Sequence, residues 1–158
     1  MSDDVWDRHA NPWSGWTRLS LPPLFAFAVW SRAWIGTWAV LLVALVVLWT
    51  WWNPRAFPKT ENTDNWMSKG VFGERIWIAQ RADRRNANPI FALPNVLAFF
   101  CAVGVAPFAW GLFAFDFWAM ATGLTLIVGG KLWFLDRMVL LFEQSTEREA
   151  SCQQGVDR

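Results

Sequence analysis

The chain has 158 residues, of which 54% are hydrophobic, and its 14 Lys or Arg nearly balance 13 Asp or Glu to give a formal net charge of +1. This composition excludes a disordered chain and a nucleic-acid-binding protein with a basic surface. The 14 tryptophans and 13 phenylalanines occur without a single tyrosine. Because tryptophan is enriched where a bilayer meets water, the aromatic content points to membrane-spanning segments.

Residues 1–22 predict a cytoplasmic N-terminus that ends in a short helix at the membrane surface. The first half is polar and acidic, so it lacks the basic and apolar regions of a cleavable signal peptide, and we expect insertion to rely on internal segments. Asn11 followed by Pro12 is typical of a helix start. We expect an interfacial helix over residues 12–20, with Arg18 directed toward lipid phosphate.

Residues 23–52 predict the first transmembrane hairpin. Within them, residues 33–52 contain no charge, and about 20 apolar residues are what a helix needs to cross the hydrocarbon core. The whole segment is long for one span and short for two. Arg32 favours two short helices, because it would cost about 2.5–3.5 kcal/mol in the middle of one long helix but reaches water in a turn. We expect Asn53 and Pro54 to end the second helix, and one long span is the alternative.

Residues 53–89 predict a basic cytoplasmic loop, with seven Lys or Arg and four acidic residues. Inside the loop, residues 66–80 place apolar side chains on one flank of a helix and Lys69 and Glu74 on the other. This pattern predicts an amphipathic helix that lies on the cytoplasmic leaflet among anionic headgroups. Two glycines in the helix weaken the prediction by about 1 kcal/mol each relative to alanine.

Residues 90–142 predict a second transmembrane hairpin, and residues 143–158 a polar C-terminal tail. Pro107 lies inside the first helix of this hairpin, where we expect a kink. The turn falls at Phe115 and Asp116, and the last span follows it to about residue 135.

Small residues gather on one face of that last span. Close helix contacts in lipid depend on small side chains that let backbones approach each other. We therefore expect this face to be the packing centre of the bundle, unless the glycines are merely tolerated there. The face consists of Ala119, Thr122, Gly123 and Gly130.

Together these segments predict an all-α membrane protein with four transmembrane helices in two hairpins, together with short interfacial helices. The hairpins resemble a weak internal repeat, since a Leu-Pro pair opens each one, at Leu21 and Leu93. If both hairpins start and end on one side, that side carries every Lys and Arg except Arg32, with Lys131 counted on it. Because cytoplasmic flanks collect Lys and Arg, both termini are expected to be cytoplasmic.

Charged residues near the predicted spans are the candidates for a functional or network role. Lys131 is the one cation within an apolar helix, which makes it a site hypothesis by default, although it can also snorkel to the interface or pair with Asp136. Two adjacent acid and base pairs would connect the loop helix to the end of the last span. The candidates are Glu74, Arg75, Lys131, Asp136 and Arg137.

Other signatures of chemistry are weak. His9 is the only histidine, so a bis-histidine haem or a His-rich metal site cannot form within one chain, and we interpret it as a surface residue. Cys101 and Cys152 lie far apart without a CxxC spacing, which argues against a disulfide or a zinc site. Asp116, at the outer turn, needs only water as its partner. We expect no metal and no cofactor.

Four motifs together resemble a family of small Trp-rich bacterial integral membrane proteins known as a domain of unknown function. They are HANPWSGWTR, NPRAFP, FGERIW and KLWFLDRMVLLFE, and the resemblance covers about residues 6–143. It implies a location in the bacterial inner (cytoplasmic) membrane and no mechanism.

The leading hypothesis is a non-enzymatic integral membrane protein that binds or assembles a partner or an apolar ligand in the plane of the membrane. Its expected partners are bilayer lipids, with anionic headgroups at the basic loop, and another membrane protein or a second copy of the chain, but not nucleic acid. The alternative is a small transporter or membrane enzyme that uses Lys131, Asp136 and the Glu74/Arg75 pair. A third hypothesis is a pigment or quinone site between the hairpins, lined by tryptophans.

Overall fold

The computed structural model describes residues 3–60, 64–82 and 92–156, and every regular element in these residues is a helix. The elements in chain order are α1 Asp3–His9, α2 Pro12–Leu19, α3 Leu21–Trp30, α4 Arg32–Ile35, the 3-10 turn η1 Gly36–Trp38, α5 Ala39–Ala56, α6 Trp66–Ala82, α7 Ala92–Ala114 and α8 Phe117–Val156. The predicted all-helical architecture is therefore confirmed. Part of the predicted basic loop and the predicted start of the second hairpin, at residues 83–91, lie outside the described residues.

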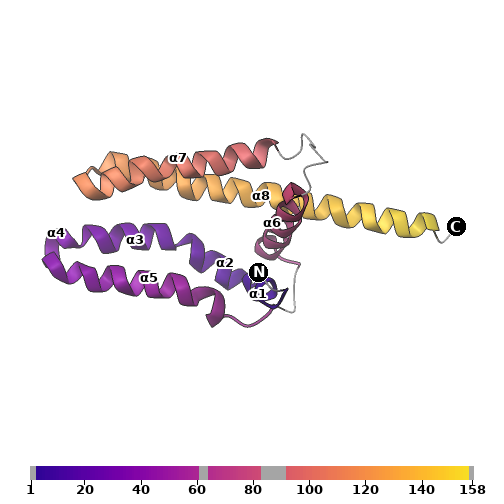
Figure 1. The fold of residues 1–158 in the computed structure, drawn as a ribbon, viewed down its shortest axis with the longest axis horizontal. Helices are drawn as coiled ribbons and strands as arrows, with labels where there is room; N and C mark the ends of the chain where they lie inside the picture. The colour runs from indigo at the N-terminus through magenta and orange to yellow at the C-terminus, as the bar shows by residue number, and fades with distance from the viewer. Residues whose placement is uncertain (1–2, 61–63, 83–91, 157–158) are drawn as a thin grey trace.

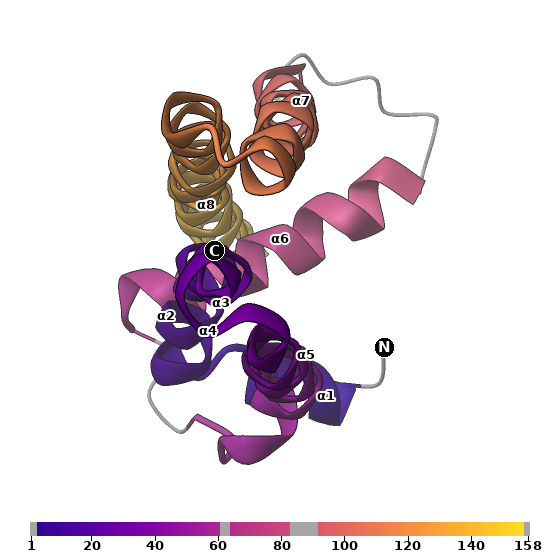
Figure 2. The same cartoon turned by 90° about the vertical axis from the view of Figure 1, so that its left-hand side faces the viewer.

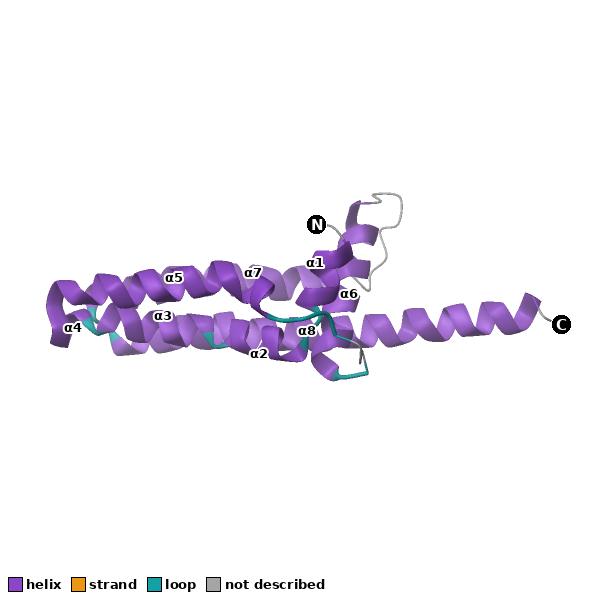
Figure 3. Cartoon of the chain, turned by 90° about the horizontal axis from the view of Figure 1, so that it is seen from below, coloured by secondary structure: helices purple, strands orange, loops and turns teal. Residues whose placement is uncertain are grey.

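Two helical hairpins lie side by side with their tips at the same end of the molecule (Figure 1). The first consists of α3 and α5, and the second of α7 and the first half of α8. Figure 2 shows α3 between α5 and the second hairpin. At the opposite end, which we call the base, α6 crosses α8, and the C-terminal part of α8 extends beyond the rest of the molecule (Figure 3).

The start of α2 forms by local capping, as the sequence predicts. The Asn11 side chain accepts a hydrogen bond of 3.0 Å from the backbone N–H of Trp13, and Pro12 occupies the first turn. The prediction that Arg18 reaches for lipid phosphate is wrong. Its guanidinium turns inward and donates to the carbonyl oxygens of Ser14 and His9, at 3.0 and 2.9 Å. The carbonyls at the end of α1 lack helical partners, and Arg18 satisfies one of them.

The tip of the first hairpin is the predicted turn, and Arg32 fastens it to the second hairpin. Gly36 adopts a φ of +58°, which glycine tolerates without steric cost. Arg32 donates to the carbonyl oxygens of Leu112 and Phe113 at the end of α7, the second at 2.8 Å. Arginine suits this position because it carries five donors and the last carbonyls of a helix have no partner within it.

Helix α5 runs past the point where we expected it to end. Asn53 and Pro54 lie inside the helix, which continues to Ala56. The Asn53 side chain is fully buried, accepts a hydrogen bond from Ser14 at 3.2 Å and donates one to Thr17 at 2.7 Å. These bonds to α2 hold the final turn of α5 in place, so the missing N–H of one proline does not end the helix.

Helices α7 and α8 pack closely through glycines on both sides. A methyl group at Gly123 of α8 would overlap the backbone of Phe108, and one at Gly130 would lie 2.7 Å from the Cys101 sulfur. Gly104 of α7 likewise allows close approach to α8. The predicted packing face is therefore correct at its two glycines, but Thr122 is exposed and falls outside the contact.

The predicted turn between α7 and α8 is confirmed, but the helix that follows is much longer than expected. Phe115 adopts a φ of +56°, and the Asp116 carboxylate accepts hydrogen bonds from the backbone N–H groups of Trp118 and Ala119, at 3.0 and 3.1 Å. Helix α8 then continues for 40 residues to Val156. The tail over 143–156 is rich in Glu and Gln, which favour helix.

Helix α6 forms where predicted, and α8 covers much of its apolar flank. Met67 and Val71 are buried within the protein, whereas Ile78 remains exposed. Gly70 faces Leu135, and a methyl group at Gly73 would overlap the backbone of Met138. The glycines that weaken the helix prediction thus permit its packing. The first half of the flank that we expected to lie on the cytoplasmic leaflet is therefore covered by the protein's own helices.

Two small hydrophobic cores hold the bundle together. Near the tip, α3 meets α7 and α8 around Ala26, Phe108, Leu112 and Met120. At the base, α6, α7 and α8 meet around Trp77, Leu97, Phe134 and Met138. No core of this kind includes the middle of α5, whose aliphatic side chains are largely exposed.

Two segments of the described chain are long and apolar enough to cross a membrane, Pro12–Asn53 and Leu93–Ala114. The first has 42 residues and folds back on itself as the α3–α5 hairpin. The four predicted spans correspond in sequence to α3, α5, α7 and the first half of α8.

Candidate functional site

A charged junction lies at the base, where α2, α6 and α8 converge. Lys131 of α8 donates to both carboxylate oxygens of Glu74 on α6, at 3.1 and 3.2 Å. The ammonium also lies 4.7 Å from the centre of the Phe134 ring. Glu74 and Lys131 are 57 positions apart in the sequence, so the pair ties the loop helix to the last helix of the bundle.

The pair lines a small cavity of about 130 Å³. Its walls combine three charged side chains with small and aliphatic ones: Gly15, Arg18, Leu19, Met67, Val71, Glu74, Lys131 and Leu135. Two cations thus share the cavity with one anion. The other lining residues are uncharged, so no second carboxylate in the lining balances the excess positive charge.

His9 sits beside this junction and is not the surface residue that the sequence suggests. It is half-buried, and burial together with the positive charges of Arg18 and Lys131 lowers its pKa from 6.5 to about 4. Among the described residues, its Nδ1 is buried without a hydrogen-bond partner. His9 is therefore neutral at pH 7.

The lining of this cavity does not include the remaining predicted candidates, Arg75, Asp136 and Arg137. Asp136 and Arg137 pair with each other on α8, with 3.4 Å between the carboxylate and the guanidinium. Arg75 is half-buried next to Glu74 on α6. Lys131 bonds Glu74 rather than its neighbour in sequence Asp136, because α6 crosses α8 directly over it.

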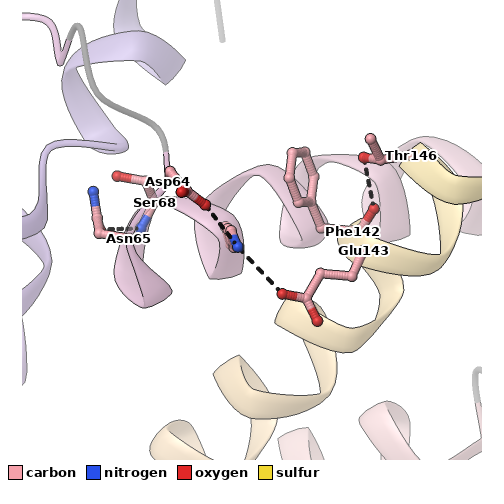
Figure 4. A network of polar contacts seen from close by, with 7 residues as sticks. Asp64, Asn65, Ser68, Phe142, Glu143 and Thr146 are labelled. Carbon is pink, nitrogen blue, oxygen red and sulfur yellow. Dashed lines mark hydrogen bonds and ion pairs between the residues drawn. The ribbon is translucent and has the colours of Figure 1, made fainter. Parts of the chain in front are cut away.

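A second link between α6 and α8 lies farther along α8. Lys69 lies between two carboxylates, 2.9 Å from Asp64 and 3.3 Å from Glu143, and Figure 4 shows these groups together. The hydrogen bonds to Asp64 and Glu143 raise the pKa of Lys69, and the one from Lys69 lowers the pKa of Asp64. Nearby, Asn65 caps α6 by accepting from the N–H of Ser68, and Thr146 donates to the Phe142 carbonyl (Figure 4).

The junction brings charged groups together, but the residues that line its cavity include no Ser, Cys or His side chain. A catalytic site needs a nucleophile or a metal beside its acid and base. Among the residues that the structure describes, no three His, Cys, Asp or Glu side chains come together as metal ligands. Cys101 is half-buried in α7 and Cys152 is exposed on α8, both as free thiols.

Two arginines with structural roles could not be recognised from the sequence. Arg18 connects α1 to α2 and lines the charged cavity, and Arg32 connects the two tips. Arg18 donates to the end of the preceding helix, nine positions away, whereas Arg32 donates to the end of α7, 80 and 81 positions away. In the sequence, an arginine near a helix end indicates that it can bond unpaired carbonyls, but it does not indicate which helix end supplies them.

The comparisons with known proteins identify one family and no characterised relative. Residues 1–157 match the model of a family described as a family of unknown function (DUF6653). No curated protein and no solved structure gives a significant match to the chain.

Proposed function

Since the chain belongs to the family of unknown function DUF6653, whose description assigns no activity, we propose its function from the arrangement of its residues. We propose that it is a non-enzymatic protein of the bacterial inner membrane, with four spans and both termini in the cytoplasm, that binds lipid or a membrane-protein partner through the exposed faces of its first hairpin.

The observation that carries this proposal is the exposure of the most apolar helices. Of the 18 most apolar consecutive residues in Pro12–Asn53, only 6% are buried inside the protein. Of the corresponding 18 residues in Leu93–Ala114, 28% are buried. A core helix of a soluble protein buries its apolar residues, because exposed apolar surface of this extent is costly in water. In α5, Val40, Leu45 and Leu48 are each at least 60% exposed. A bilayer or a partner within it would cover them.

Exposed tryptophans form two bands, one at the tip and one at the base, and these bands support hairpins that cross the bilayer. The tip band consists of Trp34, Trp38, Trp110 and Trp118, and the base band of Trp13, Trp16, Trp51, Trp52 and Trp133. Along α5, the bands are separated by about 20 Å at about 1.5 Å per residue. This spacing is shorter than an average hydrocarbon core of about 30 Å, so we expect local thinning of the bilayer around the protein.

The distribution of charge supports a cytoplasmic base. Arg32 is the one Lys or Arg at the tip in the described part of the chain, whereas the base carries Arg18, Arg55, Lys69, Arg75 and Lys131 together with the charged end of α8. Lys and Arg are retained on the cytoplasmic side during insertion. The basic end would also lie among anionic headgroups, where each cation near the surface contributes about 1 kcal/mol.

Topology reporters test the proposal. Fusions at residue 5, near residue 62 and at residue 155 should all report cytoplasm, and the protein should stay with membranes through alkaline carbonate extraction. A periplasmic N-terminus would show that the first hairpin is instead one long span. Release by carbonate would exclude membrane integration altogether.

A second candidate function is favoured by the charged cavity. Because Arg18, Glu74 and Lys131 line an internal space, a small transporter or membrane enzyme could use them to bind an anion or pass a proton. Complementation of a deletion strain with Lys131→Met and with Asp136→Asn separates the two functions. Full rescue by both variants excludes the transporter or enzyme, and loss of rescue by Lys131→Met alone, with the protein still folded, supports it.

A further inference from the structure

A groove of about 770 Å³ opens at the tip of the first hairpin. It is much larger than the charged cavity at the base, and its volume lies within the range of ligand sites. Small and aliphatic residues from α3, α4, η1 and α5 form most of its walls, with Phe115 of the second hairpin at one edge. The residues that matter for the argument are Val29, Arg32, Val40, Val43 and Phe115.

The groove has a charged end and an apolar end. Arg32 lies on α4, which forms the tip of the first hairpin (Figure 1), and the exposed Trp34 and Trp38 follow it closely in the sequence. Val40 and Val43 lie progressively farther along α5 toward the base, where the lining is aliphatic. An amphiphile with an anionic head and a hydrocarbon chain has the same polarity along its length.

The charge of Arg32 is not neutralised within the described part of the chain. Its Nη2 donates to the carbonyls of Leu112 and Phe113, and the guanidinium lies 4.2 Å from the centre of the Phe115 ring, but no carboxylate forms an ion pair with it. The nearby Asp116 carboxylate already accepts two N–H groups of α8. Arginine has five N–H donors, so Nη1 and Nε can bind an external anion.

We propose that this groove binds one phospholipid with a net negative headgroup, whose phosphate pairs with Arg32 and whose acyl chain lies along Val40 and Val43. The inference rests on the membrane placement proposed above and names the ligand of the first hairpin. Guanidinium and phosphate form short, charge-assisted hydrogen bonds, which are stronger where water is scarce. A second copy fits less well, because Asp116 is the only acidic residue at the tip in the described part of the chain and its Oδ1 already caps α8.

Native mass spectrometry of the full chain in a non-ionic detergent tests the ligand. After delipidation, the protein is titrated with phosphatidylglycerol and with phosphatidylcholine of the same acyl chains. We expect one phosphatidylglycerol to bind about tenfold more tightly than phosphatidylcholine, the scale of one charge-assisted contact. Arg32→Gln should abolish this preference, while Arg32→Lys should keep most of it.

Two substitutions on α5 test the position of the chain. Val43→Phe fills the groove without touching Arg32 and should weaken both lipids, whereas Leu45→Phe, at a position that is 60% exposed and outside the groove, should weaken neither. Circular dichroism checks that each variant keeps its helices. If Arg32→Gln does not fold, Arg32→Lys and Val43→Phe still decide the question.

Three outcomes would overturn the inference: equal binding of the two lipids, a preference that survives Arg32→Gln, or a dimer that forms in place of lipid binding and is lost in Val43→Phe. None of them affects the four-span proposal, which depends on the topology reporters. Conversely, release of the protein by carbonate would contradict the membrane placement, but it would not change the measured preference between the two lipids.

Discussion

Lys131 on α8 and Glu74 on α6 form the ion pair that joins the loop helix to the longest helix of the protein. Glu74 is the less accessible partner, with a side chain that is 26% exposed against 42% for Lys131. Removal of either partner therefore leaves a partly buried charge beside Arg18. The lone glutamate would keep one cation in the cavity, whereas the lone lysine would leave two like charges together.

We predict that Glu74→Gln destabilises the protein more than Lys131→Met. The first variant leaves Arg18 and Lys131 unbalanced in the cavity, and the second leaves Glu74 with Arg18. The coupling energy of the pair should be about 1 kcal/mol, since both side chains are partly exposed. Unfolding in detergent of the two single variants and the double variant measures it. A coupling energy near zero would show that the pair makes no net contribution.

The pKa of His9 predicts how stability depends on pH. The native pKa of about 4 lies below the unfolded value of 6.5, so between these values the unfolded state binds more protons. Stability should therefore fall as the pH decreases from about 6.5 to about 4, and His9 should add no pH dependence above that range. Melting temperatures of the wild type and His9→Asn at pH 7.5 and pH 5 give the measurement. His9→Asn should lose less stability on acidification, and equal losses would exclude this role.

The hydrogen bonds of the buried Asn53 side chain should contribute to the stability of the first hairpin. Its buried amide bonds Ser14 and Thr17 of α2, so Asn53→Leu would leave the buried Ser14 hydroxyl without this partner. We expect a loss of about 1–3 kcal/mol, the usual cost of an unsatisfied buried polar group. Thr50→Val is the matched control on the same helix, because Thr50 is exposed and bonds only the Val46 carbonyl of its own helix. Similar losses in both variants would contradict the prediction.

Local rules were sufficient to predict most helix starts and turns. The cap at Asn11, the turn that begins at Arg32 and the turn at Asp116 depend on residues within four positions of each other, and each is present in the structure. The continuation of α5 through Pro54 was missed because bonds from α2 hold its last turn. The predicted polar tail is helical to Val156, and its Glu and Gln residues favour helix there.

The candidate junction was predictable only in part, for a related reason. The sequence identifies Lys131 as the unusual cation and Glu74 as a charged residue of the loop helix, yet spacing suggests Asp136 as the local partner. The observed pair depends on how α6 crosses α8, which the glycines of α6 permit. Gly70 and Gly73 could be judged only by their cost to an isolated helix, because their benefit appears when another helix lies against them.

The glycines of α8 provide the sharpest test of how the bundle packs. Gly123 and Gly129 lie on the same helix, but a methyl group at Gly123 would overlap the backbone of Phe108, whereas one at Gly129 would meet no atom within 4 Å. Gly123→Ala should therefore cost about 1–3 kcal/mol, because a rigid backbone has to move away. Gly129→Ala should be neutral or stabilise by up to about 1 kcal/mol, since alanine favours helix.

Thermal unfolding in one detergent compares the two alanine variants directly, and Gly130→Leu extends the series toward Cys101, whose sulfur would lie 2.7 Å from the added Cβ. Leu124→Ala serves as a second control, because it removes side-chain volume without forcing α7 and α8 apart. We expect the order of stability Gly129→Ala, then Leu124→Ala, then Gly123→Ala. If Gly129→Ala is as damaging as Gly123→Ala, close approach of α7 and α8 through Gly123 does not hold the second hairpin together.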